Sequence, residues 1–143
     1  KNQGVQEPQI NILGLNPHAG DQGLIGRFDL KLSKAIQLWQ KKWPDLSLRG
    51  PLVPDAAFPN IPGGAKRKNP ATYVALYHDQ GLIPFKMAHG YNEGVHLTLG
   101  LPFLRTSVDH GTAKELFGLG KANPGSMISA LQMAINHNFP EEA

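Results

Sequence analysis

The sequence predicts an α/β fold in which a sheet carries helices on both faces. Short apolar runs that end at Gly, Pro or Asn alternate with segments whose apolar residues recur at helical spacing. Such alternation is typical of strand–helix–strand units. With 143 residues, 41% of them hydrophobic and 17% charged, the chain has the composition of one globular domain. We therefore expect residues 1–143 to form a single α/β unit, with the polar residues 1–8 as a linker.

The first half is expected to contain two strands with a helix between them. The run "QINILGL" (residues 9–15) has two isoleucines and predicts a buried strand. The segment 30–43 predicts a helix with Asp29 as its N-cap, and Pro44 ends it. The run "LSLRGPLV" (46–53) predicts a second strand interrupted by Gly-Pro. The apolar positions of the helix are Leu32, Ala35, Ile36 and Leu38, with Trp39 close by.

The second half begins with a Pro- and Gly-rich loop (54–70) that is too long for a simple connection. The run "TYVALY" (72–77) predicts a strand that ends in "HDQG", and a short helix is expected over 82–88. The alternating run "GVHLTLGLPF" (94–103) predicts one strand, and "GSMISALQMAINHN" (125–138) predicts the last helix. The last helix is expected to place five apolar residues on one face: Met127, Ile128, Leu131, Ala134 and Ile135.

Composition excludes several classes of protein. Cysteine is absent, which excludes disulfides and thiolate metal sites and fits a reducing cytoplasm. No apolar run approaches the ~20 residues of a membrane span. The net charge is +3 and the basic residues are scattered, apart from "AKRKNP" (65–70), which we interpret as a solvated loop and not a nucleic-acid patch. The chain begins with Lys, and we expect it to be a piece of a longer protein.

Two histidines are candidate metal ligands because each follows an apolar run. His18 lies in "NPHAG" and His78 in "YHDQG", each near glycine and a carboxylate. Ligand sites of α/β sheets gather at the carboxyl ends of strands, so neighbouring strands would bring both imidazoles to one point. Neutral imidazole suits zinc, cobalt, nickel or iron(II). The alternative is two unrelated loop histidines, and a separation of 60 residues does not decide between them.

Three further basic residues, Lys86, His96 and Arg105, surround the "GVHLTLG" strand. Lys and Arg together make a phosphate receptor, although single basic residues beside a strand are often only solvated. The Gly-rich segment 107–127, with a possible short helix at 113–117, can bind anions through its backbone N–H groups. It matches neither G-x-G-x-x-G nor a P-loop. His110 either stacks on an adenine or belongs only to the loop.

Three long motifs carry a resemblance that covers about residues 10–135. They are "GLNPHAGDQGLIG", "YHDQGLIPFK" and "LTLGLPFLRTSVDHGTAKELFGLGKANPGSM", in this order. Together they resemble the C-terminal part of the 4-hydroxythreonine-4-phosphate dehydrogenase family of pyridoxal phosphate biosynthesis. The last motif is also similar to the adenosine-binding loop of isocitrate and isopropylmalate dehydrogenases. The resemblance implies the C-terminal portion of a longer two-domain dehydrogenase with an isocitrate/isopropylmalate dehydrogenase-like fold.

The resemblance also implies roles for individual residues. His18 and His78 match the family's metal ligands, and the third ligand of the family lies upstream of "NPHAG", outside this sequence. Lys86 and Arg105 match residues that bind the phosphate end or polar groups of the substrate. Asp55 and Asp79 match the aspartates that line the site, and Asp79 is the candidate base or ligand orienter. The loop that resembles the cofactor site contains His110, Gly111, Thr112, Ala113 and Asn123.

The implied reaction is the oxidation of 4-phosphohydroxy-L-threonine by NAD or NADP, followed by decarboxylation to 3-amino-2-oxopropyl phosphate. It requires a divalent metal (zinc, cobalt or magnesium), and the family forms a homodimer. The sequence departs from the family pattern at His96, where a substrate-contacting asparagine is usual, and at "RFD", "GKAN" and the long "NIPGGAKRKNP". Two alternatives therefore stay open. One is a sister dehydrogenase for another phosphorylated or diol-bearing acid, such as a threonate phosphate or a dihydrodiol, and the other is a non-catalytic remnant.

Overall fold

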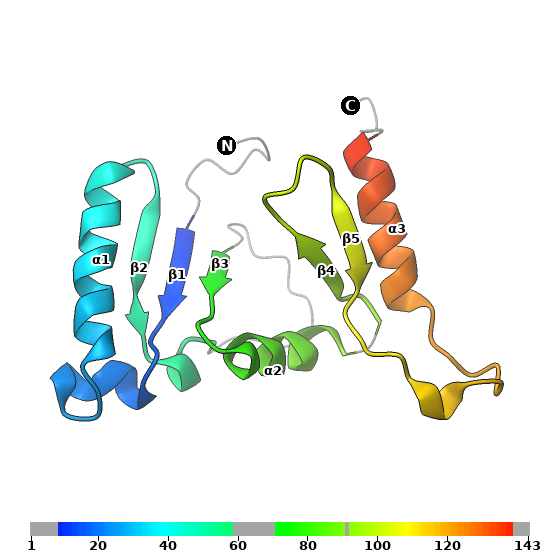
Figure 1. Ribbon diagram of the computed structural model, residues 1–143, viewed down its shortest axis with the longest axis horizontal. Coiled ribbons are helices and arrows are strands. Elements are labelled where there is room, and N and C mark those ends of the chain that lie inside the picture. The colour runs from blue at the N-terminus through cyan, green and yellow to red at the C-terminus, as the bar shows by residue number, and fades with distance from the viewer. Residues whose placement is uncertain (1–8, 59–70, 91, 139–143) are drawn as a thin grey trace. The chain divides into compact units, whose positions relative to one another are not determined.

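The computed structural model describes residues 9–58, 71–90 and 92–138 (Figure 1). The chain divides into two compact units, Lys1–Pro84 and Phe85–Ala143. That residues 1–143 form a single α/β unit of a longer protein stays a prediction. The expected linker (1–8), the basic run 65–70 and most of the long loop before the third strand lie outside the described residues.

The first unit is built on a three-stranded parallel sheet (Figure 1). Its strands are β1 (Gln9–Leu13), β2 (Ser47–Leu52) and β3 (Ala71–Val74), in the order β2-β1-β3. In the central strand, Ile10 lies opposite Leu48 of β2 and Thr72 of β3. All three strands were predicted from the sequence. The parallel sheet and its helices confirm the α/β class.

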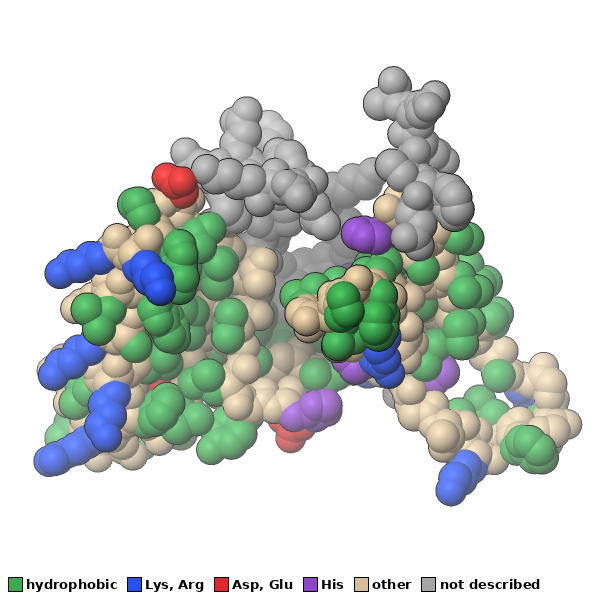
Figure 2. Space-filling view, turned by 45° about the horizontal axis from the view of Figure 1, so that its top comes forward, with side chains coloured by type: hydrophobic (Ala, Val, Ile, Leu, Met, Phe, Trp, Pro, Cys, Tyr) green, Lys and Arg blue, Asp and Glu red, His purple; other side chains and the backbone are tan. Residues whose placement is uncertain are grey.

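Helix α1 (Phe28–Lys42) covers this sheet and supplies its core. Leu32 and Ile36 pack on Ile12 of β1, with Ile10 and Leu48 at the margin. The predicted N-cap is wrong, because the helix is capped by Arg27 and Asp29 lies inside the first turn with its side chain buried. The carboxylate turns inward to bind the preceding loop, as described below. Figure 2 shows Lys and Arg side chains projecting from the side of the unit formed by α1, where Lys31, Lys34, Lys41 and Lys42 are exposed.

Helix α2 (His78–His89) begins four residues before the predicted helix, and the expected "HDQG" loop is its first turn. The strand before it, β3, ends at Val74 and is shorter than predicted. The side chain of Gln80 explains both differences. Its Oε1 accepts hydrogen bonds from the backbone N–H groups of Leu76 (3.1 Å) and Tyr77 (3.2 Å), so these residues turn into the helix instead of extending the strand.

The second unit combines an antiparallel hairpin with helix α3 (Gly125–Asn138). The hairpin consists of β4 (Val95–Thr98) and β5 (Arg105–Val108), whereas the sequence predicted a single strand. Gly100, with φ +86°, lies in the turn that reverses the chain between them. The possible short helix at 113–117 is the single turn η3 (Lys114–Leu116).

Helix α3 occupies its predicted range but buries a different face. Its buried residues are the small Ser126 and Ala130, one helical turn apart. The carbonyl of Ala130 accepts a hydrogen bond from Thr106 Oγ1 of β5 (3.0 Å), and this contact brings the two backbones close together. Of the expected apolar face, four side chains are exposed: Met127, Ile128, Leu131 and Ile135. None of the helices in the described part of the chain is long and apolar enough to cross a membrane.

Candidate functional site

The carboxyl ends of the three parallel strands carry four of the predicted site residues. His18 lies in the segment η1 (Pro17–Gly23) after β1, and Asp55 lies in the turn η2 (Pro54–Ala56) after β2. His78 and Asp79 form the start of α2, after β3. Because the strands are parallel and β1 is the neighbour of both others, all four residues follow strand ends at one edge of the sheet. All four are exposed.

The segments that carry the two histidines are joined by Gln80. Its Nε2 donates a hydrogen bond to the carbonyl of Gly14, at the end of β1 (2.8 Å). Its Oε1 holds the turn between β3 and α2 through Leu76 and Tyr77. One amide side chain therefore fixes the start of α2 against the end of β1. Sequence reasoning did not select Gln80, although its place in "YHDQG", two residues after His78, was a usable signal.

The backbone around His18 has an unusual conformation. His18, Ala19, Gly20, Asp21 and Gln22 all have left-handed φ values, between +41° and +81°. For residues with a side chain this conformation costs about 1–2 kcal/mol each. Such strain persists only where surrounding contacts impose it, and it is concentrated at functional sites.

The principal surrounding contact is the carboxylate of Asp29, which is 2% exposed. Its Oδ1 accepts a hydrogen bond from the backbone N–H of Leu15 (2.7 Å). Its Oδ2 accepts from the backbone N–H of Asn16 (3.1 Å) and from Asn16 Nδ2 (2.8 Å). No sequence pattern indicates this role, because the contacts join residues 13 and 14 positions apart.

The donors at the sheet edge suit a divalent metal but do not complete a site by themselves. Imidazole and carboxylate groups are the usual ligands of zinc and related ions. Within residues 9–58, 71–90 and 92–138, no group of three or more His, Asp or Glu side chains is arranged to hold an ion. His18 and His78 can supply part of the ligand set that the resemblance implies, and a complete coordination shell needs a further ligand.

In the second unit, His96 and Arg105 lie on one face of the hairpin. His96 pairs with Ser107 and Thr98 pairs with Arg105, so these four residues share a face. The intervening Thr106 points to α3, which places His96 and Arg105 on the opposite side. Arg105 Nη1 donates a hydrogen bond to Thr98 Oγ1 (2.8 Å), and both basic side chains are exposed. The structure thus brings two predicted substrate-binding residues onto one polar face.

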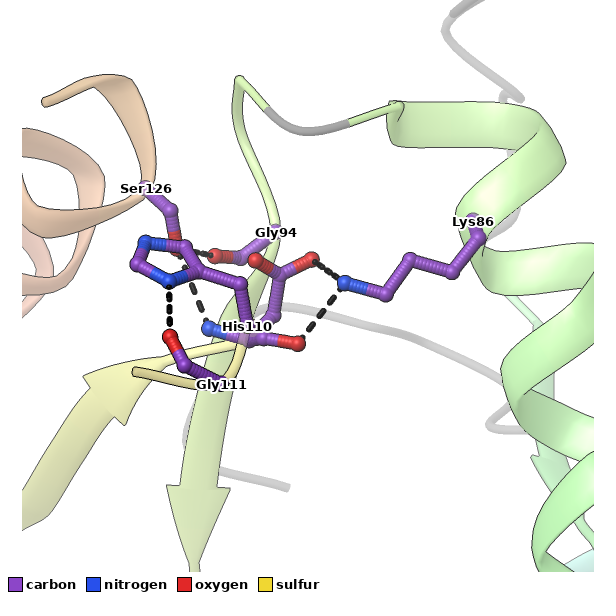
Figure 3. A network of polar contacts seen from close by, with 6 residues as sticks. Lys86, Gly94, His110, Gly111 and Ser126 are labelled. Carbon is purple, nitrogen blue, oxygen red and sulfur yellow. Dashed lines mark hydrogen bonds and ion pairs between the residues drawn. The ribbon is translucent and has the colours of Figure 1, made fainter. Parts of the chain in front are cut away.

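Lys86, the third predicted substrate-binding residue, is bound to Asp109 (Figure 3). Its Nζ donates to the Asp109 carbonyl (2.7 Å) and forms an ion pair with Oδ2 (2.8 Å). The Asp109 side chain is 3% exposed and that of Lys86 is 31% exposed. Burial raises the pKa of Asp109, but hydrogen bonding and attraction to Lys86 outweigh it, so the pKa lies below its ordinary value.

Asp109 is also tied to the start of α3 (Figure 3). Its backbone N–H donates to Ser126 Oγ (3.1 Å), and the Ser126 hydroxyl donates to the carbonyl of Gly94 (2.6 Å). These bonds connect the end of β5, the residue before β4 and the first turn of α3. Sequence reasoning missed both Asp109 and Ser126 as parts of this network. Their contacts are 17 to 32 residues apart and leave no periodic signal.

The predicted cofactor loop follows β5 directly. His110, Gly111 and Thr112 are exposed, and His110 Nδ1 lies 2.9 Å from the carbonyl of Gly111 (Figure 3). Ala113 has a left-handed backbone (φ +45°) before the turn η3. Asn123 Oδ1 accepts a hydrogen bond from the N–H of Gly125 (2.9 Å), and its Nδ2 donates to Asn92 Oδ1. Asn123 therefore supports the start of α3, and its cofactor role stays a prediction.

Comparison with known proteins settles the family. Residues 1–134 match the family model of the pyridoxal phosphate biosynthetic protein PdxA. The chain belongs to this family. Membership confirms the resemblance that three sequence motifs carried.

The curated relatives are considerably longer than this chain. The 4-hydroxythreonine-4-phosphate dehydrogenase of Desulforapulum autotrophicum is 46% identical over 132 residues, which are 92% of this chain and 37% of the relative. The enzyme of the same name from Aquifex aeolicus is 45% identical over 128 residues, 89% of this chain and 37% of the relative. The chain thus spans less than half the length of the curated relatives it matches.

Solved structures also match most of this chain over less than half of their own length. A 4-hydroxythreonine-4-phosphate dehydrogenase from Klebsiella pneumoniae has a TM-score of 0.70 and 38% identity, over 92% of this chain and 38% of that one. A terephthalate 1,2-cis-dihydrodiol dehydrogenase from Burkholderia xenovorans has a TM-score of 0.61 and 28% identity, over 94% of this chain and 40% of that one. Dehydrogenases with different named substrates therefore share this part of the fold.

Proposed function

We propose that the protein containing this chain oxidises 4-phosphohydroxy-L-threonine with NAD or NADP, and that decarboxylation then gives 3-amino-2-oxopropyl phosphate. The family and the names of its curated relatives support this proposal. The observation that carries it is the common edge of β1 and β3, where His18 and His78 follow neighbouring parallel strands. We propose the isocitrate/isopropylmalate dehydrogenase-like fold and a homodimer as the context of this reaction.

His18 and His78 are proposed to bind a divalent metal (zinc, cobalt or magnesium) together with a ligand outside the described residues. When bound, such an ion supplies Lewis-acid activation of the substrate hydroxyl. Asp79 follows His78 in the first turn of α2 and is proposed to accept the hydroxyl proton or to orient a ligand. Asp55, at the end of β2, is proposed to bind polar groups of the substrate at the same edge.

Basic residues of the second unit are proposed to bind the phosphate. Arg105 presents its guanidinium on the polar face of the hairpin beside Thr98, and His96 shares that face. A guanidinium binds phosphate through two parallel N–H donors, and an ammonium binds it as a point charge. The ammonium of Lys86, oriented by Asp109, is the proposed point charge. The loop with His110, Gly111, Thr112, Ala113 and Asn123 is the proposed cofactor site, where NAD or NADP would take up the hydride.

The metal assignment is tested in the complete protein by replacing each histidine. We expect His18→Ala and His78→Ala each to remove bound metal and to abolish substrate-dependent NAD(P) reduction. Elemental analysis after extensive dialysis measures the first effect independently of activity. His137→Ala is the control, because His137 is an exposed residue in the last turn of α3. Unchanged metal content in either ligand variant would contradict the assignment.

A sister dehydrogenase for another phosphorylated or diol-bearing acid is the second candidate. Two points favour it: the resemblance implies an asparagine where this chain has His96, and the structural likeness extends to the dihydrodiol dehydrogenase of Burkholderia xenovorans. Neutral imidazole offers one donor and one acceptor from fixed ring positions, unlike an amide. Steady-state rates with 4-phosphohydroxy-L-threonine, a threonate phosphate and a cis-dihydrodiol separate the two candidates.

A further inference from the structure

The loop that carries His18 is held from both sides by Asp29. Before His18, the carboxylate accepts the backbone N–H groups of Leu15 and Asn16 and the side-chain amide of Asn16. After His18, the buried Gly20 packs against it, and a Cβ on Gly20 would lie 3.2 Å from Asp29 Oδ2 and 2.7 Å from the Gly26 carbonyl. The chain therefore touches Asp29 on each side of the histidine.

Asp29 is itself firmly placed by the core. It lies three residues before Leu32 and seven before Ile36, so it continues the buried stripe of α1. Leu32 and Ile36 pack on Ile12 of β1, the strand from which the His18 loop departs. The carboxylate thus links the position of the packed helix to that of the loop.

The loop needs such support because its conformation is unfavourable. His18 and the next residues have left-handed φ values, which isolated residues with side chains rarely adopt. Three hydrogen bonds to one buried carboxylate, together with the contact at Gly20, impose this path. Without them the backbone that carries His18 would lose its fixed path.

We propose that Asp29 is the positioning residue for His18, which it orients toward the metal by anchoring the loop on both sides. The inference rests on the proposed function. Since all three contacts come from N–H donors, only a carboxylate can accept them all. Asparagine offers one oxygen and one NH₂ group, so in Asp29→Asn an N–H donor would face another N–H donor.

The test compares Asp29→Asn in the complete protein with a matched change on the same helix. Gln40, near the other end of α1, also holds the backbone: its Nε2 donates to the Leu46 carbonyl (2.7 Å) and its Oε1 accepts from the Leu48 N–H (2.9 Å). These contacts lie at the start of β2, at the opposite edge of the sheet. Gln40→Ala therefore removes comparable side-chain-to-backbone hydrogen bonds far from His18.

Zinc affinity, measured by competition with a chromophoric chelator below the melting temperature, is the readout. We expect Asp29→Asn to weaken zinc binding 10- to 100-fold, as for other residues that orient metal ligands. The zinc affinity of Gln40→Ala should stay within about twofold of the wild type, even if its melting temperature falls as much as that of Asp29→Asn. Hydrogen exchange of the metal-free protein should be faster at Leu15 or Asn16 in Asp29→Asn only, because the amide that faces the new NH₂ group loses its acceptor.

The outcomes separate this inference from the proposed function. If His18→Ala loses zinc while Asp29→Asn keeps wild-type affinity, only the positioning role is overturned. If His18→Ala keeps wild-type affinity, the metal role and the positioning role both fail. Should Asp29→Asn not fold, Asn16→Ala replaces it, since it removes one donor and leaves both backbone bonds. A loss of several-fold in zinc affinity supports the inference, and an unchanged affinity overturns it.

Discussion

Two buried carboxylates, one in each unit, are held by different kinds of partner. Asp29 accepts hydrogen bonds from three uncharged N–H groups, two of them on the backbone. Asp109 forms an ion pair with Lys86, whose side chain is partly exposed. Backbone N–H donors are held in place by the path of the chain, whereas the Lys86 ammonium lies on a flexible side chain and can move into solvent. Asp29 therefore determines the path of the loop that carries His18, and Asp109 determines the position of the Lys86 ammonium.

The largest expected difference between Asp29 and Asp109 is in their contribution to the free energy of unfolding. Asp29→Ala leaves three partly buried N–H donors without an acceptor, and we expect a loss of about 3–4 kcal/mol. Asp109→Ala should cost only about 1–2 kcal/mol, because the Lys86 ammonium can be rehydrated. Urea denaturation of the two variants measures both values. An equal or larger loss in Asp109→Ala would show that the ion pair is not relieved by solvent.

A second, smaller effect is expected from the glycine that faces Asp109. A Cβ on Gly94 would overlap the Asp109 carboxylate and lie 2.7 Å from Phe85 Cζ. Gly94→Ala should therefore separate Asp109 from Lys86 and cost about 2–3 kcal/mol. Gly111→Ala is the matched control, since among the described residues no atom beyond its two chain neighbours lies within 4 Å of a Cβ there, and it should change stability by less than about 0.5 kcal/mol. Equal denaturation midpoints for the two variants would contradict the close packing at Gly94.

The same comparison explains what the sequence could predict. Strands β1, β2 and helix α1 follow local patterns: apolar runs between turn residues, and apolar residues at Leu32 and Ile36. The positions of His18 and His78 after apolar runs were equally visible, and the neighbouring strands β1 and β3 place them at one edge. Local information sufficed for the elements themselves because each is indicated by the pattern of its own residues, whereas the pairing of β1 with β3 was established only by the structure.

What the sequence could not predict depends on contacts between distant residues. Asp29 has the residue type of an N-cap, and only the folded loop shows that it binds Leu15 and Asn16 instead. Strand β5 was missed because its residues, "RTSV", have too little alternation to predict a strand without the pairing to β4. The buried face of α3 was wrong because close packing at Ser126 and Ala130 selects small residues, not the most apolar ones.

The smallest expected effect is the dependence of stability on pH in acid. The pKa of Asp109 in the folded protein lies below the ordinary value of 3.8, so the folded state binds fewer protons than the unfolded state in that range. The ion pair therefore contributes its full stabilisation above about pH 4–5, and this contribution is lost as the pH falls through the lowered pKa. Lys86→Met removes the ammonium that lowers the pKa, and it should flatten this part of the acid dependence. Lys34→Met, at an exposed position of α1, should leave it unchanged. Urea denaturation between about pH 2 and 6 measures the slopes, and parallel curves for the wild type and Lys86→Met would show that Lys86 does not keep Asp109 charged.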